Sequence, residues 1–238
     1  MLTEDRGARY ADLDAWDDRA VLGALYEGQL AAVAAVDPAL PVIAAAARAV
    51  LPGLRRGGRL VDVSAGTSGR ICVQDGAQLP PTFDWPEDRL VLALAGRPGA
   101  VHKAVEDAED DVEAGAAVMV EAAVGPDDLV VGVAASGTTP YTVSAVRTTR
   151  ARGALTVGVA SNPGAPLPLS CDHAILAETG EEVVAGSARM KAGTAQKVVL
   201  NLLSTLLMTR LGRVSGGALS EWRAAATRPA AATARADG

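Results

Sequence analysis

The sequence predicts an α/β protein in which a parallel sheet carries helices on both faces. Five short apolar runs alternate with segments whose apolar residues have a helical spacing, which is the order of a βαβ chain. Two of these runs end in loops of glycine and hydroxyl residues. Aromatic residues make up only 3% of a chain that is 49% hydrophobic, so Ala, Val and Leu must build a core of closely packed helices and strands.

The strands are predicted where runs rich in Leu and Val are bounded by polar or glycine-containing segments. They cover residues 60–63, 90–95, 129–134, 155–160 and 173–176. Helices are predicted between and after them, at residues 67–76, 100–120, 139–152 and 187–211. Ser187 is expected to be the N-cap of the last helix, because its hydroxyl can accept a bond from a free backbone amide.

An N-terminal helical hairpin is predicted before the sheet. Residues 17–36 and 40–54 carry apolar residues three and four positions apart, and Asp37-Pro38 separates them. We therefore expect an N-terminal helical segment at residues 1–55, a main domain at 56–215 and a flexible Ala/Arg-rich tail at 216–238, with a short helix near 219–227. The hairpin is a candidate surface for a partner subunit.

Charge and composition exclude several classes of function. The formal charge of −6 and the pI near 5.0 argue against nucleic acid as a partner. Neither the two cysteines nor the two histidines have the spacing of metal ligands, so no metal site is expected. No signal peptide is recognised and no uninterrupted apolar run reaches the roughly 18 residues of a membrane span. We expect a cytoplasmic protein that does not contact a membrane.

Two loops have the composition of a phosphate-binding site. Gly66-Thr67-Ser68-Gly69-Arg70 follows the first predicted strand, and Ala135-Ser136-Gly137-Thr138-Thr139-Pro140 follows the third. Glycine lets the backbone approach an anion, hydroxyl groups donate hydrogen bonds, and the free amides of a helix start carry partial positive charge. Ordinary helix capping is the alternative explanation for the hydroxyl residues. We predict one phosphorylated ligand held from two sides by Thr67, Ser68, Gly69, Ser136, Gly137 and Thr139.

Two residues near the start of the last helix are weaker candidates for the same ligand. Ser187 is either a cap or a ligand contact. Lys191 lies in the first helical turn, where a positive charge opposes the helix dipole. A lysine at that position indicates a nearby anion, although a solvated side chain explains it equally well.

Several longer motifs make the chain resemble the N-acetylmuramic acid 6-phosphate etherases, which have a sugar isomerase (SIS) fold. The similarity covers residues 3–215, and the motifs follow the order and similar gaps of the family. They are GTSGR at 66–70, PPTF at 80–83, AVEDAEDD at 104–111, ASGTTPY at 135–141, SNPG at 161–164 and GSARMKAGTAQK at 186–197. The small helical C-terminal domain of longer members has no counterpart in this sequence.

The resemblance implies a homodimeric lyase of cell-wall amino-sugar recycling. Such an enzyme binds an amino-sugar 6-phosphate and cleaves its lactyl ether to N-acetylglucosamine 6-phosphate and D-lactate, without a metal or organic cofactor. The C2 proton beside the open-chain aldehyde is lost, lactate departs from C3, and water adds to the resulting double bond. An acid and a base are needed for this route.

The same resemblance identifies two catalytic positions. Glu109 is predicted to remove the C2 proton, with a solvated acidic run as the alternative. Gln78 stands where the family has its principal acid/base glutamate; glutamine can orient a group by hydrogen bonding but has no proton to exchange at neutral pH. Thr138 replaces a family arginine, which removes a charge available for phosphate or the lactate carboxylate.

Three functions remain open at the level of the sequence. The first is an etherase-like lyase with Glu109 as the base and Gln78 as a weakened polar partner. The second is a catalytically impaired sensor or regulator that binds sugar phosphates through the same loops. The third is an aldose-ketose phosphate isomerase, which needs a base near C2 but no acid at a C3 ether.

Overall fold

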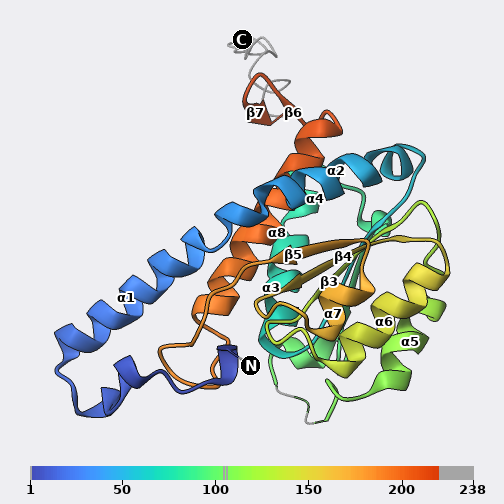
Figure 1. Ribbon diagram of the computed structural model, residues 1–238. Helices are drawn as coiled ribbons and strands as arrows, with labels where there is room; N and C mark the ends of the chain where they lie inside the picture. Colours follow the sequence, from blue (N-terminus) through green and yellow to red (C-terminus); the bar gives the residue numbers. More distant parts are fainter. Residues whose placement is uncertain (1, 104, 106, 220–238) are drawn as a thin grey trace, which may run out of the picture.

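A five-stranded parallel sheet forms the centre of the computed structural model, which describes residues 2–103, 105 and 107–219 (Figure 1). The strand order is β2-β1-β3-β4-β5. This order reverses between β1 and β3, and in such sheets ligands bind beyond the carboxyl ends of the strands at the reversal. All five strands were predicted within about two residues of their observed bounds, which are β1 (Leu60–Ser64), β2 (Leu90–Leu94), β3 (Leu129–Val133), β4 (Leu155–Ala160) and β5 (His173–Leu176).

Helices cover both faces of the sheet, as the sequence predicts (Figure 1). Alternate residues of a strand point to opposite faces, so β1 contributes Val61 and Val63 to one apolar cluster and Leu60 to the other. The first cluster is covered by α5 (Val112–Glu121), α6 (Pro140–Ala151) and α7 (Pro166–Ser170). The second is covered by α2 (Leu40–Arg55), α3 (Gly66–Gly76), α4 (Leu79–Phe83) and α8 (Lys191–Arg210).

The predicted N-terminal hairpin is present as α1 (Asp18–Ala34) and α2, joined by the 3₁₀ turn η4 (Asp37–Ala39). The Asp17 carboxylate caps α1 by accepting from the Ala20 amide at 2.9 Å. Helix α1 extends away from the sheet and contacts the body of the protein through α8 (Figure 1). By length and composition alone, residues 18–55 could also cross a membrane, with a mean hydropathy of 1.9. Inside this stretch, however, α2 is packed on the sheet.

Short elements complete the described chain. Turns of 3₁₀ helix are η1 (Leu2–Glu4), η2 (Ala8–Tyr10), η3 (Leu13–Ala15), η5 (Glu87–Arg89) and η6 (Pro98–Val101). After α8, the two-residue strands β6 (Val214–Ser215) and β7 (Ala218–Leu219) form an antiparallel pair. The helix expected near residues 219–227 and the tail after it lie outside the described residues.

Two helix starts were predicted wrongly. The helix expected at 100–120 begins only at Val112, because the Asp111 carboxylate accepts from the Ala114 amide at 2.8 Å and so caps a helix there. The chain before it contains turns, including Asp107 at a φ of +61°. The helix expected from Ser187 begins at Lys191, so Ser187 is not its N-cap.

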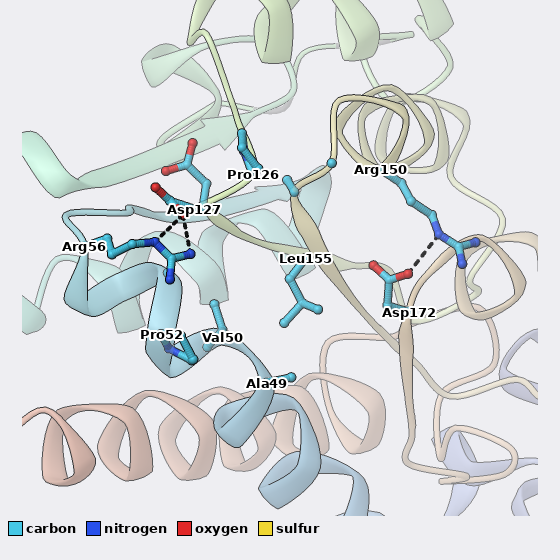
Figure 2. A pocket seen from close by; sticks show the side chains of 13 residues that line it. Ala49, Val50, Pro52, Arg56, Pro126, Asp127, Arg150, Leu155 and Asp172 are labelled. Atoms are coloured by element: carbon cyan, nitrogen blue, oxygen red, sulfur yellow. Dashed lines mark hydrogen bonds and ion pairs between the residues drawn. The ribbon is translucent and has the colours of Figure 1, made fainter.

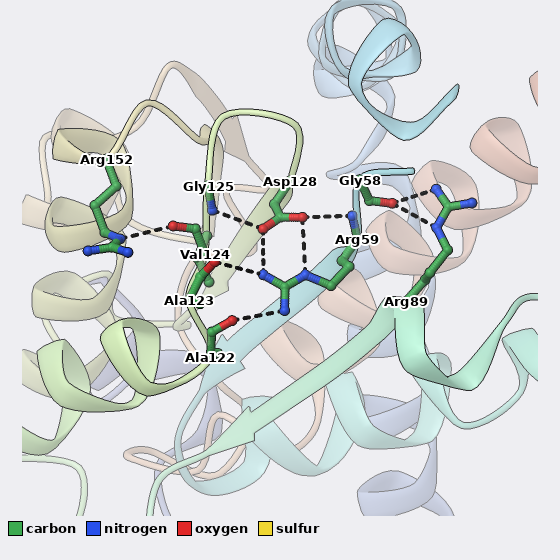
Figure 3. A network of polar contacts seen from close by, with 9 residues as sticks. All are labelled: Gly58, Arg59, Arg89, Ala122, Ala123, Val124, Gly125, Asp128 and Arg152. Atoms are coloured by element: carbon green, nitrogen blue, oxygen red, sulfur yellow. Dashed lines mark hydrogen bonds and ion pairs between the residues drawn. The ribbon is translucent and has the colours of Figure 1, made fainter. Parts of the chain in front are cut away.

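A polar network at the amino ends of the strands fixes β1 beside β3 (Figure 3). The Asp128 carboxylate is buried and accepts from the Arg59 backbone amide at 2.8 Å and from its guanidinium at 2.7 Å. Burial by itself raises the pKa of Asp128, but hydrogen bonds from Arg59 and from the Gly125 amide outweigh burial and hold this pKa below its usual value. Arg59 also donates to the Ala122 carbonyl at 2.8 Å, which ties the end of α5 to the sheet.

Candidate functional site

A hollow of about 240 Å³ opens at the carboxyl edge of the sheet, beside the reversal of strand order. The ends of β1 and β2, the first turns of α3, the η6 turn and the loop before α5 form its walls. Its lining residues are Ala65, Gly66, Arg70, Ala95, Ala100, Val105, Asp107, Ala108 and Glu109. The hollow therefore contains the first predicted phosphate loop and the predicted base in one place.

Glu109 lies between the starts of two helices. Its Oε2 is 3.8 Å from the point that a Cβ on Gly66 would occupy, and Gly66 is the first residue of α3. The Glu109 carbonyl accepts from the Tyr141 amide at 3.0 Å, in the first turn of α6. The side chain of Glu109 is exposed, so it can reach a ligand bound at the helix starts.

In the first loop, the hydroxyl residues and the glycine have different roles. Thr67 is half-buried and Ser68 is buried, both in the first turn of α3, where the backbone amides have no helical partner. A Cβ on Gly69 would lie 2.1 Å from Leu94 Cδ1, so glycine is required there for α3 to approach β2. The predicted ligand contact of Gly69 remains a prediction, because close packing alone explains this residue.

The second loop is held in a fixed turn before α6. Gly137 adopts a φ of +74°, and a Cβ there would lie 2.6 Å from the Ala165 methyl group. The Ser136 Oγ accepts from the Thr138 amide at 3.2 Å and from the Thr138 hydroxyl at 3.0 Å, which leaves the Ser136 O–H available to a ligand. Thr139 is the N-cap residue of α6, but its hydroxyl makes no capping hydrogen bond.

Asn162 positions this second loop and was not singled out from the sequence. Its Nδ2 lies 3.3 Å from the carbonyl oxygens of both Ala135 and Ser136, and 2.9 Å from the Thr3 hydroxyl. The Ser161 amide also donates to the Ala135 carbonyl at 3.0 Å. A polar Ser-Asn pair directly after a buried strand was the available signal for this role.

Buried polar atoms without a partner also gather at the carboxyl edge. Among the described residues, the hydroxyl groups of Ser161 and Thr179, which follow β4 and β5, have no hydrogen-bond partner. The same is true of both polar atoms of Gln196 on α8. Because buried polar groups are normally satisfied, their accumulation at this edge is consistent with a polar ligand site.

The start of α8 has an anion of its own. The Glu182 side chain is 1% exposed, and its two oxygens accept from the Lys191 and Ala192 amides at 2.9 Å each. The Lys191 ammonium group is directed to the Glu181 carbonyl oxygen at 2.6 Å. Glu182 therefore provides the anion that the position of Lys191 indicated. Ligand contacts by Lys191 and Ser187 remain predictions.

Gln78 is not in the hollow. It is exposed in the turn after α3, at the N-cap of α4, and its amide donates to the Asp75 carbonyl at 3.1 Å. Glu109 lies at the other end of the same 11-residue helix, which at 1.5 Å per residue is about 15 Å away. One subunit therefore does not bring the two predicted catalytic residues together.

A second hollow, of about 450 Å³, lies at the amino edge of the sheet and is a poorer candidate (Figure 2). Its charged residues pair with each other, Arg56 with Asp127 at 2.5 Å and Arg150 with Asp172 at 3.0 Å. No group of three or more potential metal ligands is found in the part of the chain that the structure describes. The smaller hollow is the better site because the helix starts and Glu109 meet there.

The parallel sheet with two hydroxyl-rich loops at its carboxyl edge defines the class of protein as a SIS domain. The SIS domain family matches residues 102–206, and the N-terminal SIS domain of the glucokinase regulatory protein matches residues 42–150. An E. coli CFT073 protein solved in complex with a sugar phosphate has the same fold, with a TM-score of 0.62 and 17% identity over 85% of this chain and 97% of that one. The Vibrio vulnificus NanR protein complexed with ManNAc-6P has a TM-score of 0.59 and 13% identity, over 82% of this chain and 65% of that one.

Closer relatives identify the family. The N-acetylmuramic acid 6-phosphate etherase of Deinococcus radiodurans is 52% identical over 222 residues, which are 93% of this chain and 73% of the relative. The etherase of Rubrobacter xylanophilus is 46% identical over 94% of this chain and 74% of its own length. The chain belongs to the N-acetylmuramic acid 6-phosphate etherase family and spans about three quarters of these relatives.

Proposed function

We propose that this protein is a carbon-oxygen lyase that cleaves the lactyl ether of N-acetylmuramic acid 6-phosphate, releasing N-acetylglucosamine 6-phosphate and D-lactate. The observation that carries the proposal is the position of Glu109 between the starts of α3 and α6. Family membership supplies the reaction and the substrate. The fold supports a sugar phosphate as ligand, because SIS neighbours were solved with sugar phosphates, ManNAc-6P among them.

The two loops hold the phosphate group. Thr67 and Ser68 contribute from α3, and Ser136 and Thr139 from the start of α6. Each helix start adds free amides and a partial positive charge, which favour an anion. The phosphate anchors C6, so the sugar carbons extend into the hollow beside Glu109.

Glu109 acts on the open-chain form of the sugar. Its carboxylate takes the C2 proton, the electron pair forms the C2–C3 double bond, and the C3–O bond to lactate breaks. Water then adds its oxygen to C3, and the proton held by Glu109 returns to C2. The departing oxygen takes its proton from water, because glutamine cannot supply one. Lack of a positioned acid typically lowers a rate by about 10² to 10⁴, so we expect slow turnover.

The protein acts as a cytoplasmic homodimer in this proposal, with α1 as the contact between subunits. One side of α1 is covered by its own chain at Ala24, Gly28 and Ala32. The other side exposes Leu22, Tyr26 and Leu30 to 65%, 66% and 54%, at a spacing of four residues that places them on one helix face. A second copy would remove this apolar stripe from water.

Gln78 enters the reaction from the second subunit in the same proposal. Within one subunit it lies too far from Glu109 to touch the same sugar, so a role at the departing oxygen requires a site assembled from two chains. Its exposed position in the turn before α4 leaves its amide free to do so.

Release of D-lactate from N-acetylmuramic acid 6-phosphate tests the function directly. The purified protein should release lactate, and Glu109→Gln should lower the rate by about 10² to 10⁴. Asp110→Asn is the matched control, because Asp110 is an exposed carboxylate of the same acidic run that does not line the hollow. Absence of lactate release, together with micromolar binding of the sugar phosphate, would replace the lyase with the sensor.

A further inference from the structure

Arg70 shares the hollow with Glu109 and has no place in the reaction described so far. It lies on α3, at the end of the first phosphate loop, and among the described residues that line the hollow it is the cation. Its Nε donates to the Val101 carbonyl oxygen of η6 at 3.1 Å, which holds the guanidinium group against one wall. Within the described chain, its two terminal nitrogens have no hydrogen bond or ion pair.

The charges in the hollow favour an acidic ligand group at Arg70 and nowhere else along its walls. Asp107 and Glu109 are the other charged lining residues, and both repel anions. A guanidinium group offers parallel N–H donors that match the two oxygens of a carboxylate. One N–H already held by Val101 fixes the orientation of the group, so less conformational freedom is lost when the ligand binds.

The substrate of the proposed function carries two anions. Its phosphate is assigned to the hydroxyl loops, which leaves the carboxylate of the lactyl group without a partner. That carboxylate is attached through the oxygen on C3, next to the C2 carbon on which Glu109 acts. A cation in the same hollow as Glu109 is therefore in the right place for it.

We propose that Arg70 binds the lactyl carboxylate and thereby selects N-acetylmuramic acid 6-phosphate over N-acetylglucosamine 6-phosphate, which lacks this group. The inference rests on the proposed function, because the reaction defines which two ligands are compared. It assigns Arg70 to specificity, while the hydroxyl loops bind the phosphate that both sugars share.

The test compares both sugar phosphates on Arg70→Gln, Arg70→Lys and a matched control. In Arg70→Gln, the KM for N-acetylmuramic acid 6-phosphate should rise about 10- to 100-fold while kcat stays within about threefold. The inhibition constant of N-acetylglucosamine 6-phosphate should stay within about threefold. Arg70→Lys should recover part of the loss, because it keeps the charge but not the paired donors. Arg97→Gln, an exposed arginine outside the hollow, should behave as the unsubstituted protein.

Two results would overturn the assignment. Equal weakening of both sugars in Arg70→Gln would mean that Arg70 supports the phosphate or the fold of the hollow, and unchanged binding of both would mean that it contacts neither. If the unsubstituted protein releases no lactate, the proposed function fails separately. The ratio of the calorimetric Kd values for the two sugars then decides the role of Arg70 on the same set of variants.

Discussion

Gln78 and Glu109 lie at opposite ends of α3 in one subunit. Glu109 is close to Gly66, the first residue of the helix, whereas Gln78 follows its last turn. The hydroxyl loops and Arg70 belong to the end with Glu109. A single chain therefore provides the base, the phosphate loops and the cation, but not the residue that replaces the family's acid.

Mixing two inactive variants tests whether a site combines residues from two subunits. Glu109→Gln and Gln78→Ala should each lower lactate release as homodimers. If each site takes Glu109 from one chain and Gln78 from the other, a mixed dimer contains one intact site, and mixing should restore up to about a quarter of the activity. Subunits are exchanged in mild denaturant, and lactate is measured after refolding.

The control for this experiment is each variant taken alone through the same exchange. Failure of the mixture to recover activity would exclude a shared site. Gln78→Ala with unchanged lactate release would remove Gln78 from the reaction altogether.

Ser136→Ala should weaken the binding of every sugar phosphate to a similar extent. The Ser136 Oγ already accepts two bonds from Thr138, so its O–H is the donor lost to the phosphate. A lost hydrogen bond to a charged group corresponds to about 10- to 100-fold in affinity. Calorimetric Kd values for N-acetylglucosamine 6-phosphate and N-acetylmuramic acid 6-phosphate measure this effect.

Ser144→Ala provides the comparison for Ser136→Ala, because the Ser144 hydroxyl donates to the Val112 carbonyl of α5 away from the loop. It should leave both Kd values unchanged. A Ser136→Ala protein that binds both sugars as tightly as the unsubstituted chain would place the phosphate elsewhere.

Tyr26→Glu should convert the dimer into a monomer. The charge would lie in the middle of the exposed apolar stripe of α1, between Leu22 and Leu30, and burying it at an interface is unfavourable. Sedimentation velocity at micromolar concentration gives the oligomeric state. Leu169→Glu is the control, because Leu169 is 72% exposed on α7.

The outcome that contradicts an α1 interface is a Tyr26→Glu protein that remains dimeric. Binding of the unsubstituted protein to lipid vesicles, lost in Tyr26→Glu, would instead assign the stripe to a membrane surface.

Asp62 should make the protein less stable as the pH rises. Its side chain, in the middle of β1, is buried beneath α3 and α8, and burial together with the nearby charge of Asp75 raises its pKa to about 8. The Lys197 ammonium group lies 3.5 Å from Asp75 rather than pairing with Asp62. In the unfolded chain the pKa of a carboxyl group is near 3.9, so the folded state alone keeps the proton between about pH 4 and 8. Stability therefore declines across that window.

Asp62→Asn should raise the free energy of unfolding at pH 7 by a few kcal/mol and flatten the decline with pH. Asp128→Asn is the matched substitution of opposite sign. It should lower this free energy by about 3 kcal/mol at neutral pH, because it leaves the Arg59 guanidinium unpaired. Since the folded pKa of Asp128 is lowered, its stabilising effect is lost as the pH falls below about 4. Urea unfolding from pH 4 to 9 measures both, and a slope with pH that Asp62→Asn leaves unchanged would contradict the assignment.

Glu182→Gln should destabilise the start of α8. The carboxylate receives two backbone amides in a buried position, and loss of its charge should lower the free energy of unfolding by about 1 to 3 kcal/mol. Thermal unfolding measures the change, with Glu178→Gln as an exposed control. Equal melting temperatures for the two variants would show that Glu182 does not hold the helix.

Strands were more accessible to prediction than helix starts. A buried parallel strand such as β3 is a continuous apolar run, and such a run is visible in the sequence itself. The starts of α5 and α8 depended on which carboxylate caps the helix. For α5 that residue is the adjacent Asp111, but for α8 it is Glu182, nine residues before Lys191, which a local pattern cannot reveal.

The sequence by itself determined the α/β class, the two hydroxyl loops and the family of this protein, because each is encoded in short runs of adjacent residues. Only the tertiary structure decided which of these runs share a site. It placed Glu109 and Arg70 together at the start of α3 and left Gln78 at the far end of that helix. The physical reason is that a helix runs back across the sheet, so residues of one motif region reach opposite edges, while distant loops converge where parallel strands end.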